Sequence, residues 1–127
     1  MTMGKSKPSA KQRTGQRGET LATEFLIQAG WVIVERNWRC ASGEIDIIAK
    51  DGETLIFVEV RTRHSANTEP NFESFTPRKR AKMIATSDEY LSTHQLEDSP
   101  YRIDAIAISF APHSAPIIEH IPDVLNW

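Results

Sequence analysis

A predicted β-hairpin over residues 43–63 constrains the fold of this chain more than any other segment. The sequence GEIDIIAKDGETLIFVEVRTR holds two runs rich in β-branched residues, separated by Asp51-Gly52. Such a pair between two strand-like runs is typical of a two-residue hairpin turn. The turn predicts that Lys50 pairs with Glu53, and the rest of the register follows outward from that pair.

The predicted register separates an acidic face from an apolar one. Side chains alternate between the two faces of a strand, so Glu44, Asp46, Glu59 and Arg61 should share one face. The opposite face should carry the apolar residues of both strands, namely Ile45, Ile47, Ile56, Val58 and Val60.

Two of the acids are candidates for binding a divalent metal ion. The register places Glu44 opposite Glu59, where like charges repel, and leaves Asp46 and Glu59 diagonal to one another, about 7–8 Å apart at the backbone. A cation shared by Asp46 and Glu59 would remove the repulsion. The alternative is a sheet face that emerges into water at one end, with Arg61 and other cations neutralising the acids.

Length and composition indicate one ordinary globular domain. The chain has 127 residues, of which 39% are hydrophobic and 25% charged. We expect a disordered basic leader over residues 1–12 and a single domain over residues 13–127. The single cysteine, Cys40, excludes an internal disulfide and suits the reducing cytosol. Neither an apolar signal core nor a membrane-length apolar run is present, so we expect a cytoplasmic protein without a membrane partner.

The net charge of −2 conceals a segregation of charge along the chain. The first 18 residues contain several cations, including Arg13 and Arg17, and no acid. A second basic cluster with Arg78, Lys79 and Lys82 opens a predicted helix, where the helix dipole disfavours positive charge. Both clusters are candidates for contact with nucleic-acid phosphate. A disordered tail and a solvated helical face are the alternatives.

The remaining periodicities predict an α/β domain with a mixed sheet. Apolar residues at helical spacing indicate a first helix over residues 15–29, followed by a strand over residues 31–38 and then the hairpin. A polar loop over residues 63–75 leads to a second helix, capped by Thr76-Pro77 and running to about Thr93. Its inward residues should be Ala81, Ile84, Ala85 and Leu91. Strands are expected over residues 102–110 and 117–121.

This helix–meander–helix–strand order, with Asp46 on one hairpin strand and Glu59-Val60-Arg61 on the other, resembles the PD-(D/E)xK restriction-endonuclease-like superfamily. More closely, the chain resembles the YraN family of small bacterial proteins, which is related to Holliday-junction resolvases. The matching segments are GEIDIIAKDG and FVEVRTR, together with Gly18-Glu19 and Asn37-Trp38-Arg39. The resemblance covers roughly residues 12 to 122 and implies a three-layer restriction-endonuclease-like core.

The resemblance also implies a metal site and a reaction. Asp46 and Glu59 would be the metal carboxylates, the main-chain carbonyl of Val60 a further ligand, and Glu19 a helical ligand to the same ion. Oxygen donors of this kind suit Mg²⁺ or Mn²⁺. The implied activity is hydrolysis of DNA phosphodiester bonds, including those of branched or junction structures. Glu19 has a second explanation, because an acid in the first turn of a helix is favoured by the dipole alone.

Arg61 departs from the superfamily pattern, in which lysine usually ends the motif. An arginine stays protonated and cannot act as a general base, although it can hold a phosphate. Asp46, Glu59 and Arg61 are therefore the candidate catalytic residues of a metal-dependent nuclease, with DNA as partner and a homodimer as the expected assembly. The alternatives are a catalytically silent nucleic-acid-binding module and a domain whose acidic face binds a basic protein.

Overall fold

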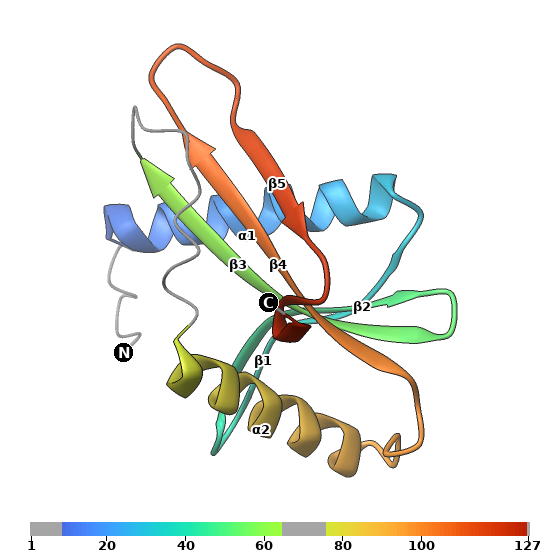
Figure 1. Cartoon of the computed structure of the whole chain (residues 1–127). Helices are drawn as coiled ribbons and strands as arrows, with labels where there is room; N and C mark the ends of the chain where they lie inside the picture. The colour runs from blue at the N-terminus through green and yellow to red at the C-terminus, as the bar shows by residue number, and fades with distance from the viewer. Residues whose placement is uncertain (1–8, 65–75, 127) are drawn as a thin grey trace, which may run out of the picture.

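The fold is a five-stranded mixed sheet covered on each face by one helix (Figure 1). The computed structural model describes residues 9–64 and 76–126. In chain order the elements are α1 (Ala10–Gln28), β1 (Val32–Cys40), β2 (Gly43–Asp51), β3 (Thr54–His64), α2 (Pro77–Thr93), β4 (Tyr101–Phe110), β5 (Ile117–Ile121) and the 3₁₀ helix η2 (Val124–Asn126).

The topology confirms the predicted order of helix, three-strand meander, helix and strand. The strands lie in the order β1-β2-β3-β4-β5, and every neighbouring pair is antiparallel except β3 and β4. A parallel pair needs a crossover connection, and α2 provides it. The predicted α/β class with a mixed sheet and three layers is therefore confirmed.

The two helices begin at polar caps that the sequence supplies. Ser9 and Gln12 form a reciprocal capping box at the start of α1, and Thr76 caps α2 with Pro77 at its first position. The start and the end of α2 match the prediction. Helix α1, in contrast, begins at Ala10, so residues 10–12 belong to the helix and were wrongly expected in the leader.

Alternation along the central strands divides the core into two apolar clusters. On one face Ile47 and Val58 pack with Leu26 of α1. On the other face Ile48 and Phe57 pack with the α2 side chains, Tyr90 among them. Each cluster is built from fully or nearly fully buried side chains, so the hydrophobic effect fixes both helices against the sheet.

The hairpin turn lies one residue later than predicted, and this shifts the register by two. Asp51 pairs with Thr54, and the ladder continues to Ile47 opposite Val58. The predicted pairs Lys50–Glu53 and Glu44–Glu59 are therefore wrong: Lys50 pairs with Leu55, and Glu44 lies beyond the end of the ladder with β3 and pairs with Arg39 of β1. A shift of two residues keeps every side chain on its face, because the side-chain period of a strand is also two.

Ile45 is the exception to the predicted division of faces. It belongs to the cluster of Ile48 and Phe57 on the α2 side, although we expected it beside Ile47. The pairing of β2 with β3 ends at Ile47, whereas its pairing with β1 continues to Gly43. The first residues of β2 therefore follow β1 away from β3, and the alternation inferred from a regular hairpin does not extend to them.

The inward face of α2 also differs from the prediction. Leu91 is buried as expected, but Ala81, Ile84 and Ala85 are exposed. The face that packs on the sheet carries Thr86, Ser87, Tyr90 and Leu91. Helix α2 thus presents a polar strip to the sheet near its start and an apolar one near its end.

The remaining strands agree with the prediction to within two residues. β1 covers most of the predicted strand over residues 31–38, and β4 and β5 match residues 102–110 and 117–121. The predicted loop over residues 63–75 begins later, because Arg63 and His64 still belong to β3, and residues 65–75 lie outside the described part. In the described ranges, no helix combines the length and apolar character needed to cross a membrane.

Candidate active site

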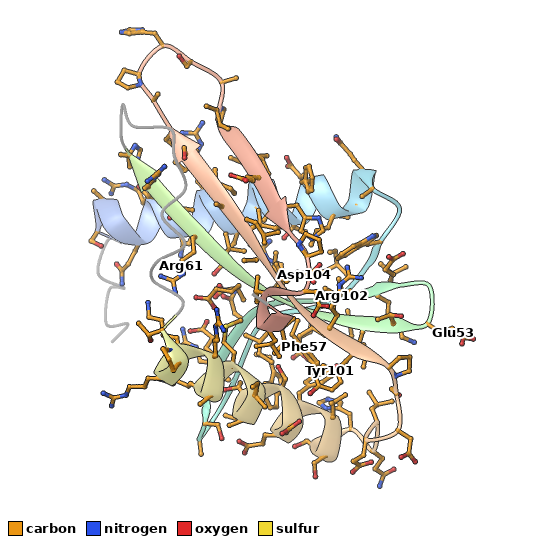
Figure 2. All side chains as sticks on the ribbon, viewed as in Figure 1. Glu53, Phe57, Arg61, Tyr101, Arg102 and Asp104 are labelled. Carbon is orange, nitrogen blue, oxygen red and sulfur yellow. The ribbon has the colours of Figure 1, made fainter. Side chains whose placement is uncertain are left out.

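A cavity of about 400 Å³ opens between the sheet and the first half of α2. Its lining gathers charges of both signs from the β2–β3 hairpin and from α2, which comes later in the chain. The lining residues are Glu44 and Asp46 of β2, Glu59 and Arg61 of β3, and Lys79, Lys82, Met83 and Thr86 of α2. The predicted shared face of the four hairpin residues is therefore confirmed. Figure 2 shows Arg61 on β3 near the start of α2.

The cavity forms where β2 and β3 separate. Beyond the Ile47–Val58 pair the ladder stops, and the backbone N–H of Val60 donates instead to Oδ2 of Asp46 at 2.8 Å. The aspartate side chain thus replaces a backbone acceptor of the missing ladder. Because the N–H and C=O of one residue in an extended strand point to the same edge, the Val60 carbonyl is also directed toward this gap.

The environment of Asp46 disfavours its charged form. Burial raises the pKa of Asp46 from 3.8 to about 7, with a further rise from the neighbouring Glu59. The hydrogen bond from Val60 N–H opposes the rise, and the charges of Glu19 and Glu44 add to it. A carboxyl whose pKa is perturbed by burial and by like charges in a cavity is typical of a functional site.

Charges of both signs act on Glu59. Burial raises the pKa of Glu59, and the positive charges of Arg61 and Lys79 oppose that rise. Nε of Arg61 is 3.3 Å from Oε1 of Glu59, so the two side chains form an ion pair along β3. Asp46 accepts a hydrogen bond from a backbone amide, and the charge of Glu59 raises its pKa.

Glu19 approaches the site from α1 but makes an ion pair elsewhere. Its Oε2 is 3.6 Å from Nη2 of Arg36, and its charge raises the pKa of both Asp46 and Glu59. Since α1 begins at Ala10, Glu19 lies well inside the helix, and the explanation by a first-turn dipole does not apply. Gly18 allows α1 to lie close to β3 at this point, because a Cβ at residue 18 would lie 1.9 Å from Cγ2 of Thr62.

The predicted nucleic-acid contacts fall into two places. Lys79 and Lys82 line the cavity, and Arg78 is exposed at the start of α2 outside its lining. Arg13 and Arg17 instead line a second pocket beside the end of β3. Lys79 and Lys82 of α2 therefore lie in the same cavity as the acids, whereas Arg13 and Arg17 of α1 lie at a different pocket.

Three residues of this region were missed or misjudged from the sequence. Met83 and Thr86 line the cavity, although neither was among the residues of α2 that were expected to face inward. The spacing of Lys79, Lys82, Met83 and Thr86 is that of one helical face. Three of these four residues are polar or charged, so a search for apolar periodicity did not find this face. His64 was taken as a loop residue, yet it ends β3, and its Nε2 lies 2.9 Å from the Thr14 hydroxyl.

The donor set fits a hard divalent cation. Asp46, Glu59 and the Val60 carbonyl supply oxygen atoms, the ligand type that Mg²⁺ and Mn²⁺ prefer. Burial raises the pKa of both Asp46 and Glu59, and the charge of Glu59 raises that of Asp46 further, so a cation between the two carboxylates would relieve an unfavourable environment. Within residues 9–64 and 76–126, no three acid, histidine or cysteine side chains already form a complete ligand group. The remaining ligands would have to come from Glu19 after it leaves Arg36, from water, or from substrate.

Comparisons with known proteins place this chain among bacterial relatives of similar length. The profile of an uncharacterised protein family, UPF0102, matches residues 18–108. A UPF0102 protein of Roseiflexus castenholzii is 45% identical over 114 residues, which cover 88% of this chain and 92% of the relative. A second, from Geotalea uraniireducens, is 43% identical over 88% of each chain. A third, from Kineococcus radiotolerans, is 37% identical over 91% of this chain and 95% of its own.

Proposed function

This chain belongs to the uncharacterised protein family UPF0102, and we propose that it is a metal-dependent endonuclease that hydrolyses DNA phosphodiester bonds. The main support for the proposal is that Asp46 and Glu59 lie together in a cavity that Lys79 and Lys82 line from α2. Acids suited to a divalent cation lie there beside lysines suited to phosphate. The order of elements supports placing the chain in the PD-(D/E)xK superfamily, beside the Holliday-junction resolvases.

Each residue of the cavity has a role in this proposal. Asp46, Glu59, the Val60 carbonyl and Glu19 would hold Mg²⁺ or Mn²⁺, which lowers the pKa of a bound water and offsets charge on the phosphate. Lys79 and Lys82 would bind the phosphate oxygens from the α2 side. Asp46 carries a proton part of the time near neutral pH, and it would release that proton when a cation binds.

Arg61 would stabilise negative charge and would not act as a general base. Its guanidinium is held beside Glu59 by their ion pair and stays protonated, so it cannot remove a proton from water. It can donate two parallel hydrogen bonds to a phosphate and stabilise the negative charge that develops on it. The proton of the attacking water would then leave to solvent or to substrate.

A catalytically silent nucleic-acid-binding module is the second candidate. Two observations favour it: arginine stands where the superfamily motif has lysine, and Glu19 is paired with Arg36. Such a module would keep the fold and the cationic wall of α2 without cleaving its ligand. The nuclease explains the raised pKa of Asp46 better, since binding to phosphate alone gains nothing from buried acids.

The decisive experiment is cleavage of a panel of linear, flapped and four-way-junction DNAs with Mg²⁺ or Mn²⁺. Asp46→Asn and Glu59→Gln should each lower the rate by about 100-fold or more, because each removes a ligand contributing several kcal/mol to the transition state. Glu53→Gln is the matched control, since Glu53 is exposed at the hairpin turn far from the cavity (Figure 2).

Three outcomes separate the candidates. Metal-dependent cleavage that both site variants abolish supports the nuclease. Salt-dependent DNA binding that the variants leave unchanged, without any cleavage, supports the silent module. An absence of DNA binding at low salt would contradict both and leave the acidic face as a protein-interaction surface. The oligomeric state measured with and without junction DNA tests the expected homodimer.

A further inference from the structure

We propose that the end of β3 and the first half of α1 form a second phosphate-binding site, separate from the carboxylate cavity. A pocket of about 240 Å³ lies there, lined by Ala10, Arg13, Thr14, Arg17, His64 and Phe110. An adjoining pocket of about 450 Å³ adds Gly15, Thr62 and Arg63. Among residues 9–64 and 76–126, neither lining contains an acidic residue, whereas the cavity at Asp46 contains three. This inference rests on the proposed function, because it assigns the phosphate to the same DNA.

The aromatic ring of Phe110 contacts two other side chains of the pocket. The guanidinium carbon of Arg17 lies 4.5 Å from the centre of the Phe110 ring. The His64 ring stacks on the same ring at 5.2 Å and 29°. An arginine held over a ring keeps N–H donors that lie in its plane, and these can bind a phosphate in pairs.

The hydroxyl of Thr14 fixes the remaining wall of the pocket. It lies 2.9 Å from Nε2 of His64 and donates to the backbone carbonyl of Ala10, so it joins the first turns of α1 to the end of β3. Among the described residues, no acidic side chain forms an ion pair with Arg17. Within the described part of the chain, Arg17 is therefore held in place by Phe110 without an acidic partner, as expected for an anion site.

The position of the pocket fits an extended nucleic acid and not a second contact to the same phosphate. His64 is five residues beyond Glu59 on β3, a distance of about 16 Å along a strand. That length corresponds to about five nucleotides of duplex at 3.4 Å per step. The start of α1, the start of α2 and the end of β3 all lie toward the same side of the molecule (Figure 1). A DNA strand on that side would meet the α2 lysines and then Arg17.

The salt dependence of DNA binding tests this site without requiring cleavage. Binding of a duplex of about 20 base pairs is measured over a range of salt concentrations in EDTA, and log K is plotted against log salt. Arg17→Gln should reduce the slope by about one and weaken binding at low salt several-fold, because one phosphate contact is lost. Arg17→Lys should restore most of the slope, since the charge remains.

Lys50→Gln is the matched control, because it removes one exposed positive charge near the hairpin turn, away from both sites. If Arg17→Gln changes the slope no more than Lys50→Gln does, the second site is contradicted. Thermal unfolding of each variant verifies that the fold is intact, and Arg13→Gln provides a second variant of the same pocket. Asp46→Asn should abolish cleavage but leave the slope unchanged. The cleavage assay therefore tests the carboxylate cavity, and the slope tests the second site. Without cleavage by the wild type, a reduced slope in Arg17→Gln would still support the site.

Discussion

Two aspartates of the same sheet, the partly buried Asp46 and the fully buried Asp104, lie in contrasting environments. Asp104 on β4 is fully buried and accepts two hydrogen bonds from Arg102, at 2.7 and 2.9 Å, and one from the Asp123 backbone N–H. It also lies 2.7 Å from Nε2 of His120. Asp46 accepts one backbone hydrogen bond, and other acids lie near it.

The difference in partners reverses the shift of the pKa. Burial acts to raise the pKa of Asp104, but the hydrogen bonds from His120, Arg102 and Asp123 N–H outweigh it and lower the pKa below its usual value. At Asp46, burial and the charge of Glu59 outweigh the hydrogen bond from Val60 N–H and raise the pKa to about 7. Asp104 is thus satisfied by the fold itself, whereas Asp46 needs a proton or a cation. The lesson is that the set of partners, more than the depth of burial, separates a structural acid from a functional one.

The largest effect should follow from removing Asp104. Asp104→Ala leaves the Arg102 guanidinium, the His120 ring and the Asp123 amide without their acceptor, and should lower the free energy of unfolding by about 3 kcal/mol. Urea denaturation measures this loss. A loss below about 1 kcal/mol would show that Asp104 is not the structural member of the pair.

The corresponding change at Asp46 should stabilise the protein at high pH. The pKa of Asp46 is higher in the folded state than unfolded, so the folded state binds more protons between about pH 4 and pH 7. Stability therefore falls as pH rises through this window and stays low above it. Asp46→Asn removes the titrating group and should raise the free energy of unfolding by about 1–2 kcal/mol at pH 8 and hardly at pH 4.

Urea denaturation at both pH values checks this prediction. Asp51→Asn, at the exposed end of the same strand, is the control and should change stability little at either pH. If Asp46→Asn is destabilising at pH 8 by as much as Asp104→Ala, the two aspartates are equivalent and the comparison fails.

A smaller effect should follow from a side chain at Gly43. This glycine has φ of +151°, and a Cβ there would lie 3.0 Å from Cε of Lys82 and from Oγ1 of Thr86. Gly43→Ala should lower the free energy of unfolding by about 1 kcal/mol and weaken DNA binding by moving Lys82. Gly15→Ala has free space around it in α1 and should instead stabilise slightly. Equal stability of the two alanine variants would contradict this account of Lys82.

The smallest effect concerns the charge of Lys79 on Glu59. Because Lys79 lowers the pKa of Glu59 against the effect of burial, Lys79→Gln should raise that pKa further. NMR titration of the labelled glutamate carboxyl measures the change. Arg78→Gln removes a neighbouring charge outside the cavity and should leave the pKa of Glu59 closer to its wild-type value.

The sequence predicted the shared face of the acids but not the opening between their strands. Period-two alternation placed Asp46, Glu59 and Arg61 together, and this survived a register error of two residues. Nothing in the local pattern indicates that β2 leaves β3 beyond Ile47, because that separation depends on pairing with β1.

The errors on the helices have a similar origin. Apolar residues at helical spacing predicted which segments are helical, but Thr86 faces the cavity while Ile84 is exposed. A helix over a charged cavity buries polar side chains, so hydrophobic periodicity alone assigns its inward face incorrectly. The network of Asp104 was not predicted either, because His120 and Asp123 are far from Asp104 in sequence and meet it only through β5 and the turn that follows.

The most direct test of the difference between the two aspartates is NMR titration of their carboxyl carbons in the absence and presence of Mg²⁺. Without Mg²⁺, the pKa of Asp46 should lie near 7 and that of Asp104 below its usual range. Saturating Mg²⁺ should lower the pKa of Asp46 strongly and leave that of Asp104 unchanged. An Asp46 that titrates like an exposed aspartate, or one whose pKa does not respond to Mg²⁺, would contradict the assignment of this cavity as a metal-dependent site.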